Sequence, residues 1–205
     1  MIKITNECNM ELMARYEDNH FDLAIVDPPY GIERFKKGIG KNDRFKVKSS
    51  AMFNNNPPTE DYFNELFRVS KNQIVWGANN FIMPPSEYFC IWNKKQTVDN
   101  FATAEYAWVS MGLKKPAKMF DYGIHKHNHT NKIHPTQKPV KLYEWLLMNY
   151  AKEGDKILDT HLGSGSIALA CHNLKYDLTA CELDTEYYEA SLKRLKQHQQ
   201  QLTMF

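Results

Sequence analysis

A carboxylate, a rigid turn and an aromatic ring are grouped within four residues, Asp27-Pro28-Pro29-Tyr30. They follow the apolar run Phe21–Val26. Two prolines cannot continue a central strand, so the chain must turn there. Asp27 and the Pro28 carbonyl could accept both hydrogens of an exocyclic amine, and Tyr30 could stack on the ring that carries the amine. The plainer interpretation is a proline-rich turn with an incidental tyrosine.

A second group of residues is typical of a nucleoside-bearing cofactor site. The segment Asp159–Leu162 is followed by Gly163-Ser164-Gly165, a helical pattern, an apolar strand and Glu182. Glycines let the backbone pass close to a ligand, and the helix that follows offers free N–H groups. An acid at the end of the next strand is placed to bind ribose hydroxyls. Because Gly163-x-Gly165-x-x-Ala168 also fits the dinucleotide fingerprint, this motif does not separate NAD from other cofactors. A plain glycine turn is its structural alternative.

The third group is His134-Pro135-Thr136-Gln137-Lys138-Pro139. It places several hydrogen-bond donors just before a helical pattern. By itself, this segment is also compatible with a loop and a helix cap.

The elements that position these groups alternate between strand and helix patterns. Apolar runs predict strands at Ile2–Thr5, Phe21–Val26, Ile74–Trp76, Phe89–Trp92, Tyr106–Val109, Lys156–Asp159 and Leu178–Glu182. Helical spacing predicts helices over Asp61–Val69, through Tyr143, Leu146, Leu147 and Tyr150, over Ile167–Leu174, and from Asp184-Thr185 onward. Most of Lys114–His134 is predicted to be loop. This order predicts an α/β, Rossmann-like fold, a mostly parallel twisted sheet of about seven to eight strands with helices on both faces.

Composition narrows the class of protein. The 205 residues predict a single domain, 1–205, and 42% hydrophobic with 24% charged residues is ordinary for a globular chain. No apolar stretch approaches 18 residues, and the N-terminus lacks a secretory pattern, so we expect no membrane partner and a cytoplasmic setting. The four cysteines lie far apart, so neither a disulfide framework nor a zinc site is expected. The run His125-x-His127-x-His129 has no cysteine or acid nearby, which favours phosphate contact or solvent exposure over a metal.

Positive charge is concentrated in two segments, although the net charge is only +2. Residues 31–48 carry a net +5 and residues 111–141 a net +6, which leaves −9 for the remainder. Two basic segments on an acidic body suggest a polyanionic partner contacted at defined places. Two solvated loops are the alternative.

The three motifs, in this order, resemble the DNA amino-methyltransferases that use S-adenosylmethionine, in particular the group with permuted (β-type) motif order. The resemblance covers nearly the whole chain, because Ile4-Thr5-Asn6-Glu7-Cys8 is also similar to the first strand and acidic loop of that group. Glu7 stands where Asp is usual, and His161 and Leu162 stand where Phe and a small residue are common. The glycines and the acidic residues remain.

The resemblance implies roles for individual residues. Asp27, Pro28, Pro29 and Tyr30 would form the catalytic turn, with Asp27 and Pro28 localising the amine lone pair and Tyr30 stacking on a flipped base. Glu182 would bind the ribose, and Asp159 with the glycine backbone would bind the methionine part. Thr136, Gln137 and Lys138 would close over the cofactor, and Glu7 and Cys8 would face its adenine end. The full cofactor set implied is Glu7, Cys8, Asp27, His134, Thr136, Gln137, Lys138, Asp159, Gly163, Gly165, Ser166 and Glu182.

The basic segments would then contact DNA from loops 31–58 and 111–133, both beside the cofactor edge of the sheet. The implied phosphate-contacting residues are Arg34, Lys36, Lys37, Lys41, Arg44, Lys46, Lys48, Lys114, Lys115, Lys118 and Lys126. The protein would act as a monomer or homodimer in the cytoplasm of a prokaryotic or phage-infected cell.

The resulting hypothesis is methyl transfer from S-adenosylmethionine to adenine N6 in DNA. Cytosine-N4 and RNA adenine-N6 methylation are the nearest alternatives, and Asp27 favours adenine because Ser is frequent there in cytosine-N4 enzymes. An NAD-dependent oxidoreductase would leave Asp27–Tyr30 and His134–Pro139 unexplained. A non-catalytic DNA-binding protein with the same fold would be expected to have lost Asp27 or the glycines, and both are present.

Overall fold

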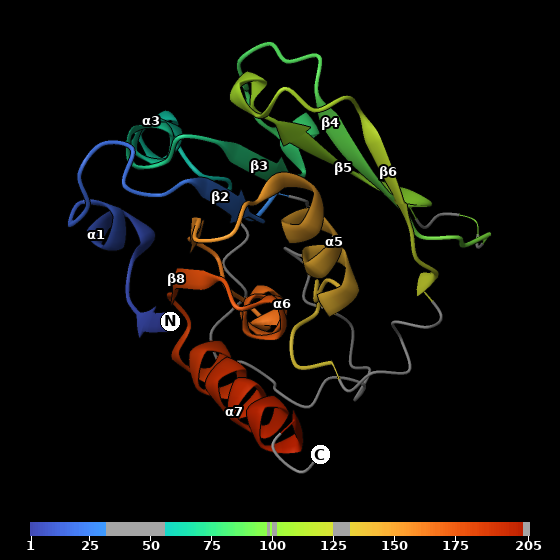
Figure 1. Cartoon of the computed structure of the whole chain (residues 1–205). Coiled ribbons are helices and arrows are strands. Elements are labelled where there is room, and N and C mark those ends of the chain that lie inside the picture. Colours follow the sequence, from blue (N-terminus) through green and yellow to red (C-terminus); the bar gives the residue numbers. More distant parts are fainter. Residues whose placement is uncertain (32–55, 98, 100–101, 125–131, 203–205) are drawn as a thin grey trace.

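The computed structural model describes residues 1–31, 56–97, 99, 102–124 and 132–202, and these residues contain an eight-stranded sheet (Figure 1). The strand order is β1-β8-β7-β2-β3-β5-β4-β6. The strands are β1 (Ile2–Asn6), β2 (Leu23–Val26), β3 (Gln73–Trp76), β4 (Phe89–Asn93), β5 (Ala104–Val109), β6 (Lys118–Asp121), β7 (Lys156–Asp159) and β8 (Asp177–Glu182).

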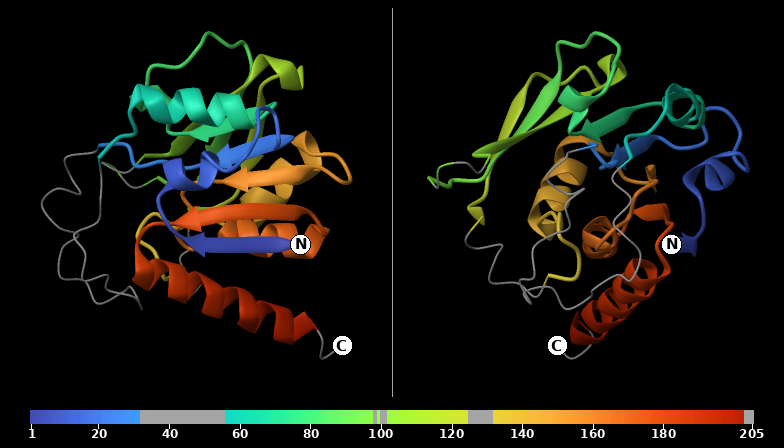
Figure 2. Two further views of the ribbon diagram at one scale, coloured as in Figure 1. Left: turned by 90° about the vertical axis from the view of Figure 1, so that its left-hand side faces the viewer. Right: turned by 180° about the vertical axis from the view of Figure 1, so that it is seen from behind.

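Strand direction divides the sheet into two parts. From β1 to β3 all neighbouring strands are parallel. β5 is antiparallel to both β3 and β4, and β6 returns parallel to β4. The strands β1, β8, β7, β2 and β3 therefore all end at one edge of the sheet, here called the carboxyl edge. In the left view of Figure 2 the arrowheads of β1, β2, β7 and β8 point to this edge.

Helices cover both faces of the parallel part. One face is covered by α5 (Val140–Tyr150), α6 (Ser166–Leu174) and α7 (Thr185–Leu202), and the other by α1 (Asn9–Met13) and α3 (Glu60–Val69). On β2, Ile25 packs in the hydrophobic core beneath α5, α6 and α7, and Val26 packs in the core beneath α1 and α3, as the two-residue period of a strand requires. Burial on both faces explains why β2 and β3 are continuous apolar runs.

The mostly parallel sheet with helices on both faces confirms the predicted fold class, and every predicted strand and helix is present. Two elements were missed. The short helix α1 was not predicted, and the four-residue strand β6 lies inside a segment predicted to be mostly loop. Two single-turn 3-10 helices, η1 (Ala78–Asn80) and η2 (Met111–Leu113), follow β3 and β5. Within the described residues, the structure contains no helix with the length and apolar character needed to cross a membrane.

Candidate active site

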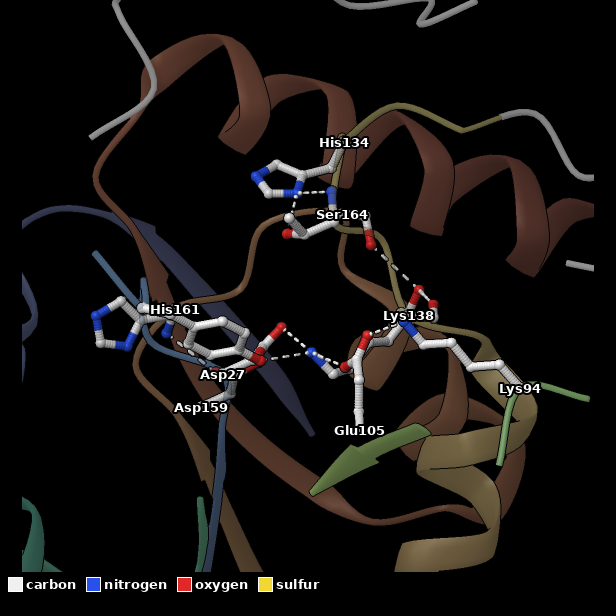
Figure 3. Close-up of polar contacts among 11 residues, drawn as sticks. Asp27, Lys94, Glu105, His134, Lys138, Asp159, His161 and Ser164 are labelled. Carbon is white, nitrogen blue, oxygen red and sulfur yellow. Dashed lines mark hydrogen bonds and ion pairs between the residues drawn. The ribbon is translucent and has the colours of Figure 1, made fainter. Parts of the chain in front are cut away.

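The strands that carry the first two motifs are neighbours in the sheet. β2 pairs in parallel with β7, with Ala24 opposite Leu158, so Asp27 and Asp159 leave the carboxyl edge side by side. The first two motifs therefore meet at this edge. The third motif enters the same region, because Lys138 reaches Asp27 directly (Figure 3).

Both oxygens of the Asp27 carboxylate have a donor. The Tyr30 hydroxyl donates to Oδ1, and the Lys138 ammonium donates to Oδ2. Lys138 Nζ also lies 3.2 Å from the Tyr30 hydroxyl oxygen. Lys138 was expected to close over the cofactor. In this structure its ammonium contacts the Asp27 carboxylate, and the cofactor role stays a prediction.

The ring of Tyr30 lies against the backbone of Gly77, directly after β3. Gly77 has φ +66°, and a Cβ atom there would be 2.1 Å from Tyr30 Cε1. Phe81 makes an edge contact with the ring at a centroid distance of 6.2 Å. Burial, and then the Asp27 charge, raise the pKa of Tyr30 well above its usual value, so its hydroxyl keeps its proton. Gly77 is a functional position that sequence reasoning missed, although a glycine ending a buried strand beside β2 was an available signal.

Two further charged residues extend the site beyond its motifs. Glu105 on β5 has its Oε2 3.2 Å from Lys138 Nζ, and Lys94, directly after β4, lies 2.6 Å from Glu105 Oε1. Burial favours the neutral form of Glu105, but Lys138 and Lys94 outweigh this and lower its pKa below the usual value. Neither residue belongs to a recognisable motif, so the sequence contained no signal for them.

The glycine loop (Gly163–Gly165) lies between β7 and α6 and is hydrogen-bonded to the Glu182 carboxylate. Gly163 N donates to Glu182 Oε2 at 2.7 Å, and Asp184 N donates to Oε1 at 2.9 Å. Gly163 and Gly165 have φ of +51° and +70°, in the left-handed region that favours glycine. A Cβ on Gly165 would lie 3.1 Å from Ser191 Cβ on α7, so the loop packs closely on that helix.

The polar side chains of Ser166 and Arg194 form further hydrogen bonds at this loop. Ser166 Oγ donates to the Lys138 carbonyl at 2.7 Å, which ties the third motif to the second. Arg194 on α7 donates from Nη1 to the Ser164 carbonyl at 2.8 Å and to Ser166 Oγ at 3.0 Å. Burial lowers the pKa of Arg194 to about 10. Ser166 was expected to contact the cofactor, whereas here its hydroxyl joins two segments of the protein.

Asp159 is a buried carboxyl group without a cationic partner. It is 2% exposed, accepts a hydrogen bond from His161 N at 3.0 Å, and has no ion pair among the described residues. Burial, together with the nearby charges of Asp27 and Glu182, raises the pKa of Asp159 to about 8. A group that carries positive charge would complete this position, and the α-ammonium of a methionine-derived cofactor fits it.

His161, which replaces the usual aromatic residue, is held by polar neighbours. Asn9 Nδ2 lies 3.1 Å from its Nε2, and Thr160 Oγ1 lies 3.0 Å from its Nδ1. Its ring also meets the edge of Tyr62 at a centroid distance of 5.2 Å. Burial lowers the pKa of His161 to about 4, so the ring is neutral at pH 7.

The remaining residues of the third motif shape the loop. His134 packs edge-on against Tyr187 at 4.4 Å and lies beside Gly163, and burial lowers its pKa to about 4. Thr136 N and Oγ1 lie 3.3 and 3.1 Å from His134 Nδ1. Gln137 Oε1 accepts a hydrogen bond from Ile133 N at 3.0 Å. These contacts hold Thr136 and Gln137 within the turn, and their expected contact with a cofactor stays a prediction.

Glu7 and Cys8 follow β1 beside the end of β8, since Asn6 pairs with Glu182. They therefore lie next to the Glu182 side of the site. The Glu7 carboxylate, however, is engaged by both Nη atoms of Arg15 at 2.5 and 2.6 Å, and this hydrogen bonding lowers its pKa to about 2. Cys8 is half-buried with a free thiol.

The residues expected to contact DNA divide into three groups. Arg34, Lys36, Lys37, Lys41, Arg44, Lys46, Lys48 and Lys126 lie outside the described residues, as do His125, His127 and His129. Lys114 and Lys115 are exposed just after η2, beside the start of β3, where Ser110 N donates to Gln73 O at 3.0 Å. This is the edge opposite the carboxyl edge, because β5 runs antiparallel to β3 (Figure 2, left). Lys118 begins β6 near that same edge. The expectation that these three lysines lie beside the cofactor edge is wrong.

Comparison with known proteins identifies the family. A family model for N6/N4 methyltransferases, described as DNA methylase, matches residues 46–193, which is well over half of the chain. The chain belongs to this DNA methylase family. The match agrees with methyl transfer, and not with the oxidoreductase hypothesis, as the class of chemistry. The Asp27–Tyr30 turn precedes the matched region and rests on the geometry described above.

Related proteins and solved structures agree with this assignment. The type II methyltransferase M.HpaI of Haemophilus parainfluenzae is 35% identical over 39% of this chain and 26% of its own length. M2.MboI of Moraxella bovis is 23% identical over 90% of this chain and 84% of its own length. The chain spans only 26%, 68% and 53% of the first three curated relatives.

Two solved structures share the fold. An M1.HpyAVI–SAM complex matches with a TM-score of 0.61 at 19% identity, over 95% of this chain and all of that one. The cytosine-N4-specific PvuII DNA methyltransferase matches with a TM-score of 0.60 at 12% identity, over 96% and 90%. At these identities the likeness describes the fold alone.

Proposed function

We propose that this protein transfers a methyl group from S-adenosylmethionine to the exocyclic N6 of a flipped-out adenine in DNA. The observation that carries the proposal is the adjacency of two acids at the carboxyl edge, Asp27 after β2 and Asp159 after β7. An amine-accepting carboxylate and a cofactor-binding loop must lie side by side for direct transfer. Membership of the DNA methylase family and the S-adenosylmethionine in the M1.HpyAVI complex support the reaction and the cofactor.

On the cofactor side, Asp159 would receive the α-ammonium, and Glu182 the ribose hydroxyls. Each Glu182 oxygen already accepts one backbone N–H and retains a second lone pair for a hydroxyl donor. The left-handed Gly163 and Gly165 would let the backbone approach the ligand closely. The bound cofactor would supply an electrophilic methyl group on a sulfonium, a leaving group that needs no metal.

On the acceptor side, Asp27 Oδ1 and the Pro28 carbonyl would accept the two hydrogens of the target amine. Accepting these hydrogens localises the nitrogen lone pair for in-line attack on the methyl carbon, and positioning supplies the catalysis. The amine nitrogen would form its bond to the methyl carbon as the methyl–sulfur bond breaks, which leaves a neutral thioether, and the surplus proton on the nitrogen would pass to water. The Tyr30 hydroxyl hydrogen-bonds to Oδ1, and we propose that it swings away as its ring stacks on the arriving base, which leaves Oδ1 to the amine.

The DNA contacts would come mainly from the basic segment that follows the catalytic turn. Gly31 and Pro57, at the two ends of residues 32–55, lie close together, with a Cβ at Gly31 3.2 Å from Pro57 Cδ. The segment therefore starts and ends beside Tyr30. Its seven Lys and Arg residues would neutralise phosphates there. Because the relatives come from bacteria, we place the protein in the cytoplasm of a prokaryotic or phage-infected cell, acting as a monomer or homodimer.

Cytosine-N4 methylation is the second candidate, because cytosine presents the same exocyclic amine and the PvuII enzyme shares the fold. One experiment tests both. The purified protein is incubated with a random-sequence DNA library and isotopically labelled S-adenosylmethionine, and the DNA is digested to nucleosides for mass spectrometry. We expect labelled N6-methyladenine. Labelled N4-methylcytosine would instead support cytosine-N4 methylation. Labelled RNA from a parallel incubation would identify RNA as the substrate. The absence of label from every product would refute methyl transfer.

A further inference from the structure

A chain of four alternating charges leads from the catalytic turn away from the cofactor loop. Asp27 pairs with Lys138, Lys138 with Glu105, and Glu105 with Lys94 (Figure 3). Asp27 follows β2, Lys138 precedes α5, Glu105 lies on β5 and Lys94 follows β4. The two carboxylates balance the two ammonium groups, so these four side chains carry no net charge together.

Lys138 lies at the centre of this chain and is fixed on all sides. Its residue is 4% exposed, its ammonium donates hydrogen bonds to Asp27 and Tyr30, and Nζ lies 3.2 Å from Glu105 Oε2 in an ion pair. The rings of Tyr30 and Trp76 lie 5.7 and 5.5 Å from Nζ. Burial by itself would lower the pKa of Lys138, but Asp27 and Glu105 raise it above the usual value. The side chain is therefore a buried ammonium with a defined position.

This position matters for the proposed reaction because the target amine needs an acceptor oxygen on Asp27. A buried ammonium that faced Asp27 alone would move to bridge both oxygens once the Tyr30 hydroxyl left, since an unshared buried charge is costly. It would then compete with the amine. Glu105 gives Lys138 a second carboxylate, with Oε2 3.2 Å from Nζ, and Lys94 lies 2.6 Å from the other oxygen of Glu105.

We propose that Glu105 is a positioning residue for methyl transfer, which acts through Lys138 to keep Asp27 Oδ1 available to the target amine. The inference rests on the proposed function and extends the site to the antiparallel strand β5, which carries none of the sequence motifs. Glu105 itself contacts neither the base nor the cofactor.

The first test is kinetic. Glu105→Gln keeps the shape of the side chain and removes its charge. We expect kcat to fall about 10- to 100-fold, the scale of misplacing a reacting group by about 1 Å, with calorimetric affinity for S-adenosylmethionine within about twofold of wild type. Lys94→Met should cause a smaller fall in the same direction. In a Lys138→Met background, Glu105→Gln should change kcat less than about twofold, because its effect passes through Lys138.

The matched control is Glu144→Gln. Glu144 on α5 is also a buried glutamate that pairs with a lysine, Lys141, at 2.7 Å, but it lies away from the site and bonds to Asn173. It should keep kcat. Thermal unfolding of both variants measures any general loss of stability. If Glu105→Gln keeps wild-type kcat, or loses as much activity with Lys138 absent as with it present, the inference is overturned.

The second test needs no activity and therefore separates failure of this inference from failure of the proposed function. In lysine ¹⁵N-labelled protein, a buried and hydrogen-bonded ammonium exchanges slowly and gives a resolved ¹H–¹⁵N signal, assigned by its absence in Lys138→Met. We expect this signal in wild type and Glu144→Gln, and its loss or displacement in Glu105→Gln. An unchanged signal in Glu105→Gln would overturn the positioning role even if wild type methylates no DNA.

Discussion

The ring of Tyr30 occupies the space that a side chain at Gly77 would need. The Cβ of any other residue at Gly77 would lie 2.1 Å from Tyr30 Cε1, and the backbone there is left-handed. Gly77 follows β3 and Tyr30 follows β2, so the neighbouring strand sets the position of the aromatic ring in the catalytic turn.

Gly77→Ala should therefore impair methyl transfer by displacing Tyr30. The left-handed backbone alone should reduce the free energy of unfolding by about 1–2 kcal/mol. Gly154→Ala is the matched control, because Gly154 has φ +86° with nothing within 4 Å of its Cβ position. In urea titrations Gly154→Ala should lose only this backbone contribution, Gly77→Ala should lose at least as much because of the contact with Tyr30, and only Gly77→Ala should lose kcat. Equal kcat in the two variants would contradict the role assigned to Tyr30.

Asp27→Ala should reduce kcat by about 10²-fold or more, comparable to removing one preorganised charge-stabilising group. Because Asp27 also accepts a hydrogen bond from buried Lys138, the free energy of unfolding should fall by about 1.5–3 kcal/mol. Calorimetry should give nearly unchanged affinities for cofactor and DNA. Methylation of adenine at a near wild-type rate by this variant would return Asp27–Tyr30 to the interpretation as a simple turn.

Glu182→Gln should weaken S-adenosylmethionine binding by about 1–3 kcal/mol, since the amide replaces an oxygen that accepts from both the glycine loop and a ribose hydroxyl. Asp177→Asn, at the opposite end of β8, is the control and should bind normally. Isothermal titration calorimetry of the two variants checks this. Equal affinities would exclude Glu182 as the ribose acceptor.

Stability should be greatest near pH 6.5. The pKa values of His134 and His161 are lowered from 6.5 to about 4, so the unfolded chain binds more protons and stability falls as pH decreases from about 6.5 to 4. The pKa of Asp159 is raised from 3.8 to about 8, so the folded state holds an extra proton and loses stability as pH rises toward about 8. Each group contributes up to about 1.36 kcal/mol per pH unit.

Denaturant titrations of the cofactor-free protein from pH 4 to 9 measure this profile. Asp159→Asn should remove the decline between about pH 6.5 and 8, and His161→Gln should reduce the acid slope by about one proton. An Asp159→Asn protein that keeps the wild-type decline would show that another group titrates there.

DNA affinity should fall steeply with salt. Removing one lysine that neutralises a phosphate should reduce the log–log salt slope by about 0.9. Replacing Lys36, Lys37 and Lys41 together should reduce it by up to about 2.7. The double variant of Lys114 and Lys115, on the opposite edge of the sheet, should leave it unchanged. Fluorescence anisotropy at several salt concentrations measures both. If the Lys114 and Lys115 variant reduces the salt slope and the triple lysine variant does not, DNA binding is assigned to the edge opposite the carboxyl edge.

The sequence by itself determined the parallel part of the fold and the edge at which its motifs lie. Apolar runs bounded by prolines or glycines marked β2 and β7, and parallel strands end at one edge, so Asp27 and Asp159 were expected at the same edge. Their adjacency depends on the long-range pairing of β2 with β7. Gly163, Gly165 and Glu182 follow from the same local rules. These inferences depend on local patterns and on the direction of parallel strands, which the chain order of strands and helices fixes.

Only the tertiary structure could show the side-chain contacts that depend on pairing between strands far apart in the sequence. Lys138 reaches Asp27 across 111 residues, and Glu105 joins them only because β5 packs antiparallel beside β3. The same reversal carries Lys114 and Lys115 to the opposite edge. No local sequence pattern indicated the direction of strands β3–β6. The carboxylate that a long lysine side chain contacts depends on which acidic residues the folded sheet brings within its reach.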